Sequence, residues 1–245
     1  MRSFYDIEYA DNLELDLHLP QSETFDLFVY FHGGGLVSGD RKGVEVFAKT
    51  LAKHNIATAS VEYTMYPKAK FPDFITDCAK SVAYLKNNIS KYGKCKRLFV
   101  GGSSAGGYIS MMLCFDERYF KNVGIAPCEI DGYIHDAGQP TSHFNVLKEF
   151  GKDSRRVIVD ETAPLYFVGT QEKYPPMLFA ISDNDMFARH EQTMLMIKTL
   201  EGFGHKDNVF LHVESGKHSS YVCKQDENGE GVFANIILGF LDKLG

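Results

Sequence analysis

Short runs of apolar residues recur along the chain and predict the strands of a buried β-sheet. An uninterrupted run such as LFVYF at 27–31 is typical of a parallel strand covered on both faces, because neither face then carries polar side chains. The predicted strands span residues 27–31, 56–63, 97–102, 123–127, 177–182 and 209–213.

Between these runs, apolar residues recur three and four positions apart, a spacing that predicts amphipathic helices. The predicted helices span residues 44–54, 73–92, 105–115, 143–151, 190–204 and 231–244. Residues 4–19 instead alternate apolar and polar side chains about Asp11-Asn12, which indicates a hairpin. A hairpin followed by alternating strands and helices predicts an α/β fold with a mainly parallel central sheet and helices on both faces.

No internal repeat or linker divides the chain, so we expect residues 1–245 to form one domain. Residues 129–174 are less regular than the rest and lie between predicted strands, which predicts a small lid-like insertion. The aromatic side chains of this segment either line an access groove or pack as a small core beneath the loop. They are Tyr133, His135, His143, Phe144 and Phe150.

Charge and cysteine usage narrow the class of partner. The 26 Lys and Arg against 32 Asp and Glu give a net charge of −6, which argues against nucleic acid, since phosphate binding requires a basic face. No apolar stretch approaches the roughly 18 residues of a membrane span, so no membrane partner is expected. Acidic residues near the N-terminus argue against a signal peptide. Five scattered cysteines without a CxxC pair indicate free thiols in a reducing compartment, and we expect a cytoplasmic protein.

The segment Gly102-Ser103-Ser104-Ala105-Gly106 lies between a predicted strand and a predicted helix and fits the G-x-S-x-G pattern. Glycines on both sides of the serine let the strand and the helix approach closely around a sharp turn that exposes the hydroxyl. Ser104 is therefore the candidate nucleophile, whereas the frame of Ser103 would require glycine at position 105. The alternative interpretation is a strand-to-helix turn of small residues without chemistry.

A second motif, His32-Gly33-Gly34-Gly35, directly follows the predicted strand at 27–31. Consecutive glycines let backbone N–H groups face a ligand without obstruction by side chains. With the N–H of Ala105, the N–H groups of Gly33 and Gly34 could bind the oxyanion of a tetrahedral intermediate. A flexible glycine turn is the alternative, and a phosphate loop fits less well because no Lys-Ser or Lys-Thr follows.

A serine nucleophile needs an imidazole base that is oriented by a carboxylate. In one known arrangement of such triads, in which the serine lies on a G-x-S-x-G turn, the acid and the histidine follow the serine in that order, each just after a strand. His218 is the only one of the nine histidines in a loop after the last predicted strand, which makes it the candidate base. Asp183 and Asp185 both follow the strand at 177–182, and position alone does not separate them.

Metal sites are not predicted at these residues. Asp183-Asn184-Asp185 lacks the further acidic ligands and the glycine of a calcium loop. His205, His212 and His218 lack the short spacing of zinc ligands.

In combination these motifs resemble the HGGG-type carboxylesterases of the α/β-hydrolase superfamily, which include the hormone-sensitive-lipase-like esterases. The resemblance covers nearly the whole chain and rests on YFHGGG (30–35), SGDR (38–41), VEYTMYPKAKFPDFITD (61–77), GGSSAGG (101–107), PPMLFAISDNDMF (175–187) and GKHSSY (216–221). In that family the acid is the aspartate before a short apolar pair, a position that Asp185-Met186-Phe187 fits. The resemblance thus implies a triad and three oxyanion donors: Ser104, Asp185, His218, Gly33, Gly34 and Ala105.

The compact length and SGDR are most similar to small bacterial feruloyl or acetyl esterases, with kynurenine formamidase a close relative. The resemblance implies an α/β-hydrolase fold and a serine carboxylesterase for short-chain acyl or aromatic-acid esters, acylated sugars included, without metal or organic cofactor. Leu36 stands where tryptophan is common in those relatives, in a chain that has no tryptophan, so we expect it to shape the acyl pocket. Substrate contacts are also expected from His32, Gly35 and Tyr133.

Two other functions remain open from the sequence. One is an arylformamidase that hydrolyses N-formylkynurenine, and the other is an inactive binding protein on the same fold. The expected partner is a small-molecule ester, and the oligomeric state is left open.

Overall fold

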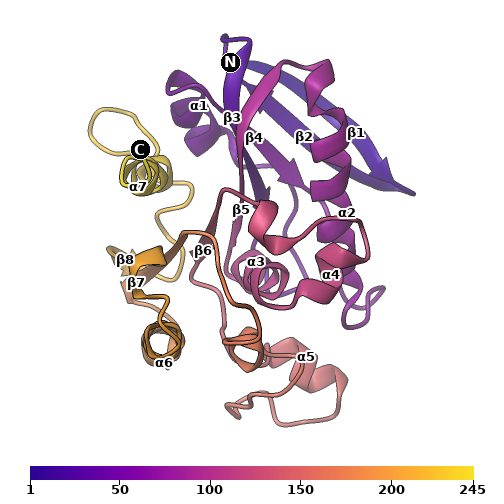
Figure 1. Cartoon of the computed structure of the whole chain (residues 1–245), viewed down its shortest axis with the longest axis vertical. Helices are drawn as coiled ribbons and strands as arrows, with labels where there is room; N and C mark the ends of the chain where they lie inside the picture. Colours follow the sequence, from indigo (N-terminus) through magenta and orange to yellow (C-terminus); the bar gives the residue numbers. More distant parts are fainter.

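The apolar runs pair side by side in one eight-stranded sheet with the strand order β1-β2-β4-β3-β5-β6-β7-β8 (Figure 1). The computed structural model describes residues 1–245. Its strands are β1 (Arg2–Ala10), β2 (Leu13–Leu19), β3 (Thr24–Phe31), β4 (Ile56–Val61), β5 (Lys94–Ser103), β6 (Gly132–Asp136), β7 (Met177–Asn184) and β8 (Val209–Lys217).

The sheet is mainly parallel, as the alternation of strands and helices predicts. The pairs from β4 through β3, β5, β6 and β7 to β8 are parallel, while β2 is antiparallel to both β1 and β4. The hairpin predicted at 4–19 is confirmed as β1 and β2, which extend the sheet at one edge. Since parallel strands end on the same side, the loops after β3, β5, β7 and β8 meet along one sheet edge.

Helices cover both faces of the sheet, with α1 and α7 on one side and α2 and α3 on the other (Figure 1). The helices are α1 (Glu45–Lys53), α2 (Asp73–Asn88), α3 (Ala105–Phe115), α4 (Glu117–Lys121), α5 (Phe144–Glu149), α6 (Arg189–Gly202) and α7 (Val232–Leu241). None of these helices has both the length and the apolar character that crossing a bilayer demands.

Two hydrophobic cores lie on the two faces of the sheet. The larger contains 45 buried residues, among them Ile109 and Met112 of α3. The smaller contains 19, and in it Phe47 of α1 packs edge-to-face on Phe233 of α7 with ring centroids 5.4 Å apart. Apolar side chains on both sheet faces explain why the central strands read as uninterrupted apolar runs.

One predicted strand is wrong. Residues 123–127 form a turn after α4, and the strand lies at β6, between β5 and β7. β6 contains His135 and Asp136, two polar residues that are buried and that do not fit the apolar pattern of a central strand. The segment between β6 and β7 is therefore 137–176, shorter than the insertion expected at 129–174; its lid-like function stays a prediction.

The helix α3 lies against the end of β3 at a distance that only glycine permits. A β-carbon at Gly106 would be 1.9 Å from the backbone oxygen of Phe31, and one at Gly102 would be 2.5 Å from the same oxygen. These contacts give the two flanking glycines of the G-x-S-x-G motif a packing function.

We predict that Gly106→Ala destabilises the protein by about 3 kcal/mol, because the backbone of Phe31 must move to admit the methyl group. Gly239→Ala in α7 is the matched control, since no atom lies within 4 Å of the added carbon. Removing a helical glycine there should stabilise by about 0.5–1 kcal/mol. Urea unfolding of both variants measures the difference, and equal effects would contradict the packing explanation.

Candidate active site

Ser104 lies on a sharp turn between β5 and α3. Its backbone adopts φ 55° and ψ −111°, a conformation that is unfavourable for a residue with a side chain. The turn is held by a hydrogen bond from the Ser104 N–H to the Asp136 carbonyl of β6 (2.8 Å), while the Ser104 carbonyl accepts from Tyr108 of α3 (3.0 Å). The backbone is thus fixed on both sides of the hydroxyl.

The structure brings Ser104, His218 and Asp185 into one hydrogen-bonded chain. His218, directly after β8, has its Nε2 atom 2.8 Å from the Ser104 Oγ. Its Nδ1 atom lies 2.5 Å from Oδ1 of Asp185, which follows β7. With a proton on Nδ1 donated to Asp185, Nε2 is free to accept the proton of the serine hydroxyl.

Asp185 is held ionised by its surroundings. Burial alone would raise its pKa, but the hydrogen bond and charge of His218 and the N–H groups of Met186 and Ser182 lower the pKa below the usual value. These N–H groups donate to the two carboxylate oxygens at 2.6 and 3.1 Å. A carboxylate that is fixed in this way keeps both its charge and its orientation toward the imidazole.

The two aspartates that position alone does not separate have different contacts. Asp183 Oδ1 accepts a hydrogen bond from the Gly216 N–H at 2.9 Å, within the segment that leads to His218. Asp183 therefore supports that segment, and Asp185 alone contacts the imidazole.

The loop of Gly33, Gly34 and Gly35 after β3, called the glycine loop below, lies against the turn at Ser104 (the nucleophile turn). A β-carbon at Gly33 would be only 3.3 Å from Cβ of Ser104. The Gly33 carbonyl accepts from His32 Nδ1 (2.7 Å), and the Gly34 carbonyl accepts from the N–H groups of Val37 and Ser38 (3.2 and 3.1 Å). These carbonyls are engaged, and the N–H groups of Gly33 and Gly34 have no protein acceptor. Gly34 has φ 118°, and any β-carbon there would collide with the Ser38 carbonyl, so glycine is required.

A cavity of about 400 Å³ opens over Ser104. Met186 from the loop after β7 and Phe144 from α5 line it opposite the glycine loop, together with Ser219 and Val222. Asn145, the residue after Phe144, donates from Nδ2 to the Gly35 carbonyl at 2.5 Å. The segment after β6 therefore both lines the cavity and holds the glycine loop.

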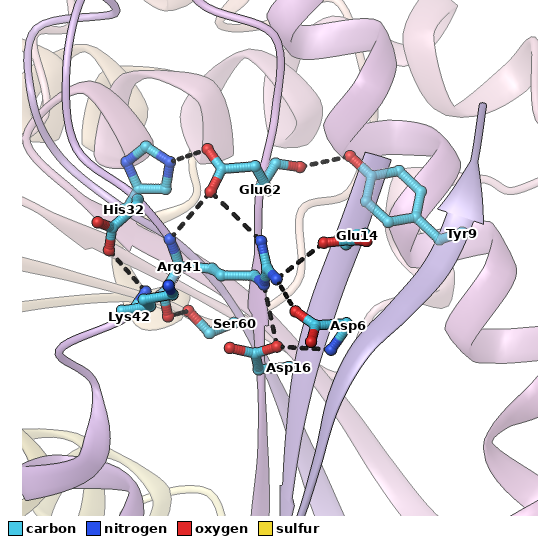
Figure 2. Close-up of polar contacts among 10 residues, drawn as sticks. Asp6, Tyr9, Glu14, Asp16, His32, Arg41, Lys42, Ser60 and Glu62 are labelled. Atoms are coloured by element: carbon cyan, nitrogen blue, oxygen red, sulfur yellow. Dashed lines mark hydrogen bonds and ion pairs between the residues drawn. The ribbon is translucent and has the colours of Figure 1, made fainter. Parts of the chain in front are cut away.

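His32 is buried beside the glycine loop and contacts the Gly33 carbonyl. It is 5% exposed, its ring stacks on Tyr63 at 4.3 Å between centroids, and its Nε2 lies 3.3 Å from Glu62 Oε1. Figure 2 shows that Glu62 also reaches Arg41, whose backbone N–H donates to Glu62 Oε2 at 3.3 Å. The position of His32 is thereby connected to the segment that contains Arg41.

Arg41 is the centre of a charge network that joins the glycine loop to the N-terminal hairpin (Figure 2). Its guanidinium contacts Asp16 (2.9 Å), Glu14 (2.8 Å), Glu62 (3.8 Å) and Asp6. Its side chain is only 11% exposed, and Asp16 is 5% exposed. Burial would lower the pKa of Arg41, but Asp16, Asp6 and Glu14 raise it, so the side chain stays charged.

Three of the expected substrate contacts do not line the cavity over Ser104. Leu36 has φ 67° and is fully buried in the larger core, because the turn after the glycines directs its side chain inward. Tyr133 is a buried residue of β6 that donates to the Pro127 carbonyl at 3.0 Å. His32 is engaged with Glu62 and the Gly33 carbonyl. Of the expected set, Gly35 alone lines the cavity, and its contact with substrate stays a prediction.

Several residues around the site had no recognisable signal in the sequence. SGDR contains Arg41, but nothing in the pattern indicated that four acidic residues would surround it. Met186 appeared only as part of the position that marks the acid. Asp136 had no signal, because β6 itself was misplaced.

The strand order, the turn at Ser104 and the hydrogen-bonded serine, histidine and aspartate define a protein of the α/β-hydrolase fold. Within that class the chain belongs to the BD-FAE family, whose family model matches residues 15–146.

Similarity to individual proteins agrees with this assignment. A probable isoprenylcysteine alpha-carbonyl methylesterase of Arabidopsis thaliana is 28% identical over 113 residues, which cover 45% of this chain and 27% of the relative. Arylacetamide deacetylase-like 3 of Homo sapiens is 32% identical over 107 residues, 42% of this chain and 26% of the relative. The chain spans about a quarter of the length of the curated relatives it matches.

Among solved structures, Esterase B from Lactobacillus Rhamnosis (HN001) superimposes with a TM-score of 0.79 at 16% identity. The match covers 98% of this chain and 85% of that chain, and it shows a shared fold.

We predict that Arg41→Met lowers the free energy of unfolding by about 2–3 kcal/mol, because Asp16 and Glu62 lose their cation while they stay buried or half-buried. Arg155→Met is the matched control, since Arg155 is 88% exposed and pairs only with Asp153. Its urea midpoint should not move. Equal midpoints for the two variants would show that the Arg41 network does not stabilise the fold.

Proposed function

We propose that this protein is a serine esterase that hydrolyses small carboxylic esters through an acyl-enzyme. The observation that carries the proposal is the hydrogen-bonded chain from Asp185 through His218 to Ser104, which ends in a cavity beside unpaired backbone N–H groups. Membership of the BD-FAE family and the esterase names of the Arabidopsis relative and of Esterase B support it.

In the first half of the reaction, the Ser104 Oγ attacks the ester carbonyl carbon and passes its proton to Nε2 of His218. The new C–O bond moves an electron pair onto the carbonyl oxygen. The N–H groups of Gly34 and Ala105, with that of Gly33, bind the resulting oxyanion. His218 then protonates the departing alcohol, and the acyl group stays on Ser104.

In the second half, water replaces the alcohol and follows the reverse geometry. His218 accepts a proton from water as its oxygen attacks the acyl carbon, and then returns a proton to the Ser104 oxygen as the acid leaves. Asp185 keeps the imidazole oriented and stabilises its charged form in both halves, while it remains ionised itself.

The lining of the cavity favours an uncharged acyl group. Its lining contains Tyr30, Phe144, Met186 and Val222 together with glycines, serines and His218, and it includes no Asp, Glu, Lys or Arg side chain. Uncharged short-chain acyl groups therefore fit better than carboxylate-bearing ones, because an anion would lose its hydration without gaining a cation. We propose short-chain or aromatic-acid esters of soluble alcohols, acylated sugars included, as the substrate class.

The folded protein should react with a fluorophosphonate probe at Ser104 and hydrolyse p-nitrophenyl acetate. Ser104→Ala should lose both properties, with the residual ester rate lower by a factor of about 10⁴ or more. Mass spectrometry of the labelled peptide and a p-nitrophenol assay measure the two outcomes. Wild-type protein without label would contradict the proposal, and a preference for N-formylkynurenine by orders of magnitude would reassign it to an arylformamidase.

The two aspartates should separate in a kinetic comparison. Asp185→Asn should lower kcat by roughly 10³–10⁴, because the imidazole loses its orienting charge. Asp183→Asn should lower kcat by no more than about tenfold, because it removes charge only from the support of the Gly216 segment. The reverse order of the two effects would assign the acid to Asp183.

A further inference from the structure

A buried carboxyl group lies beneath the nucleophile turn and takes no part in the mechanism above. Asp136 ends β6, is 0% exposed and lies opposite Ser103 in the parallel pairing of β5 with β6. Its backbone carbonyl accepts the hydrogen bond from the Ser104 N–H at 2.8 Å. Asp136 is therefore attached directly to the turn that presents the nucleophile.

The same residue is attached to the segment that carries His218. The hydroxyl of Tyr221, three residues after His218, donates a hydrogen bond to Oδ1 of Asp136. Tyr221 is 1% exposed, and its ring packs at 6.2 Å from the ring of Phe233 in α7, which fixes the position of the hydroxyl. One aspartate thus joins the two segments whose alignment the reaction requires.

Few hydrogen bonds offset the energetic cost of burying the carboxyl group of Asp136. Its Oδ2 atom and the neighbouring Ser103 hydroxyl are enclosed and make no hydrogen bond of good geometry. Burial raises the pKa of Asp136 to about 6, against the lowering effects of the Ser103 and Tyr221 hydroxyls and of His218. Groups that destabilise the fold in this way are characteristic of functional sites.

The charges around Asp136 come from the segments after β7 and β8. Asp185 lies on one side and raises the pKa of Asp136, while His218 lowers it; Tyr30 of β3 and Tyr221 are the other ionisable neighbours. Of these groups, only His218 becomes positive during the proposed reaction. A carboxylate in a site of low dielectric favours a nearby cation, and the interaction is reciprocal.

We propose that Asp136 is a positioning residue for His218: its carboxylate favours the protonated imidazole, and its contact with Tyr221 holds the loop that carries the histidine. This inference rests on the proposed function, in which His218 accepts the serine proton. The side chain of Asp136 makes no hydrogen bond to the Ser104 Oγ, so it acts through His218 and through the loop that Tyr221 holds.

The kinetic test separates the charge of Asp136 from its contact with Tyr221. Asp136→Asn keeps an oxygen for Tyr221 but removes the charge, so kcat/KM for p-nitrophenyl acetate should fall by roughly three- to tenfold above pH 6, where the wild-type carboxyl group is ionised, and by less below that pH. Tyr221→Phe removes the contact and should lower kcat about tenfold with little change in KM. A loss of activity by Asp136→Asn that is the same at every pH would show a merely structural residue and would overturn the inference.

Stability should change in the opposite direction from activity. Because the pKa of Asp136 is raised on folding, the wild type loses stability as pH rises through about 6, and Asp136→Asn is free of this loss. The variant should therefore melt at an equal or higher temperature than the wild type at pH 8, and the difference in Tm should grow between about pH 4 and pH 6 and stay constant above pH 6. A lower Tm of Asp136→Asn at pH 8 would contradict the inference, provided that the variant is correctly folded, as judged by complete reaction with the fluorophosphonate probe in a parallel sample.

A carbon-13 NMR titration of the Asp136 carboxyl group tests the coupling without turnover. In His218→Gln the midpoint should rise, because the imidazolium no longer favours the carboxylate. His212→Gln is the matched control, since His212 lies on β8 and pairs with Glu214 instead. An unchanged midpoint in His218→Gln overturns the inference even in an active esterase, whereas failure of fluorophosphonate labelling overturns only the proposed function.

Discussion

The backbone conformation of Ser104 is the constraint on which the rest of the structure depends. Ser104 has a positive φ and forms a sharp turn between β5 and α3. This turn brings β5 and α3 close to the end of β3, and glycine at positions 102 and 106 leaves room for the Phe31 carbonyl. The same approach brings the glycine loop after β3 beside the serine. The hydroxyl and the backbone N–H groups opposite it thus result from one packing requirement.

Charge is arranged asymmetrically around this turn. Gly33 and Gly34, whose N–H groups have no protein acceptor, line the cavity, while Asp185 contacts His218 and Glu62 contacts His32. Such an arrangement favours negative charge on the substrate side and positive charge on the imidazole, which is the distribution that acyl transfer develops. Arg41 balances the excess of carboxylate on the hairpin side, and Glu62 connects this network to His32 at the start of the glycine loop.

Local patterns predicted the elements well wherever side chains faced an apolar core. The runs at 27–31 and 177–182 became β3 and β7, because strands buried on both faces have no alternative to apolar residues. The exception is β6, where His135 is buried and its Nδ1 lies 2.9 Å from the Ser110 hydroxyl of α3. A partner on a distant helix made a polar residue acceptable in a central strand, and no local pattern reports such a partner.

By itself the sequence determined the α/β class, because this follows from the periodicity of apolar residues. It also determined the order of Ser104, acid and His218 along the chain, and the glycines at the sharp turns, which need backbone conformations that other residues rarely adopt. Tertiary structure alone decided which aspartate faces the imidazole, that Leu36 and Tyr133 turn into the core, and that Asp136 and Tyr221 lie behind the triad. The physical reason is that side-chain direction at the end of a strand depends on the neighbouring strands and loops, which are close in space but far apart along the chain.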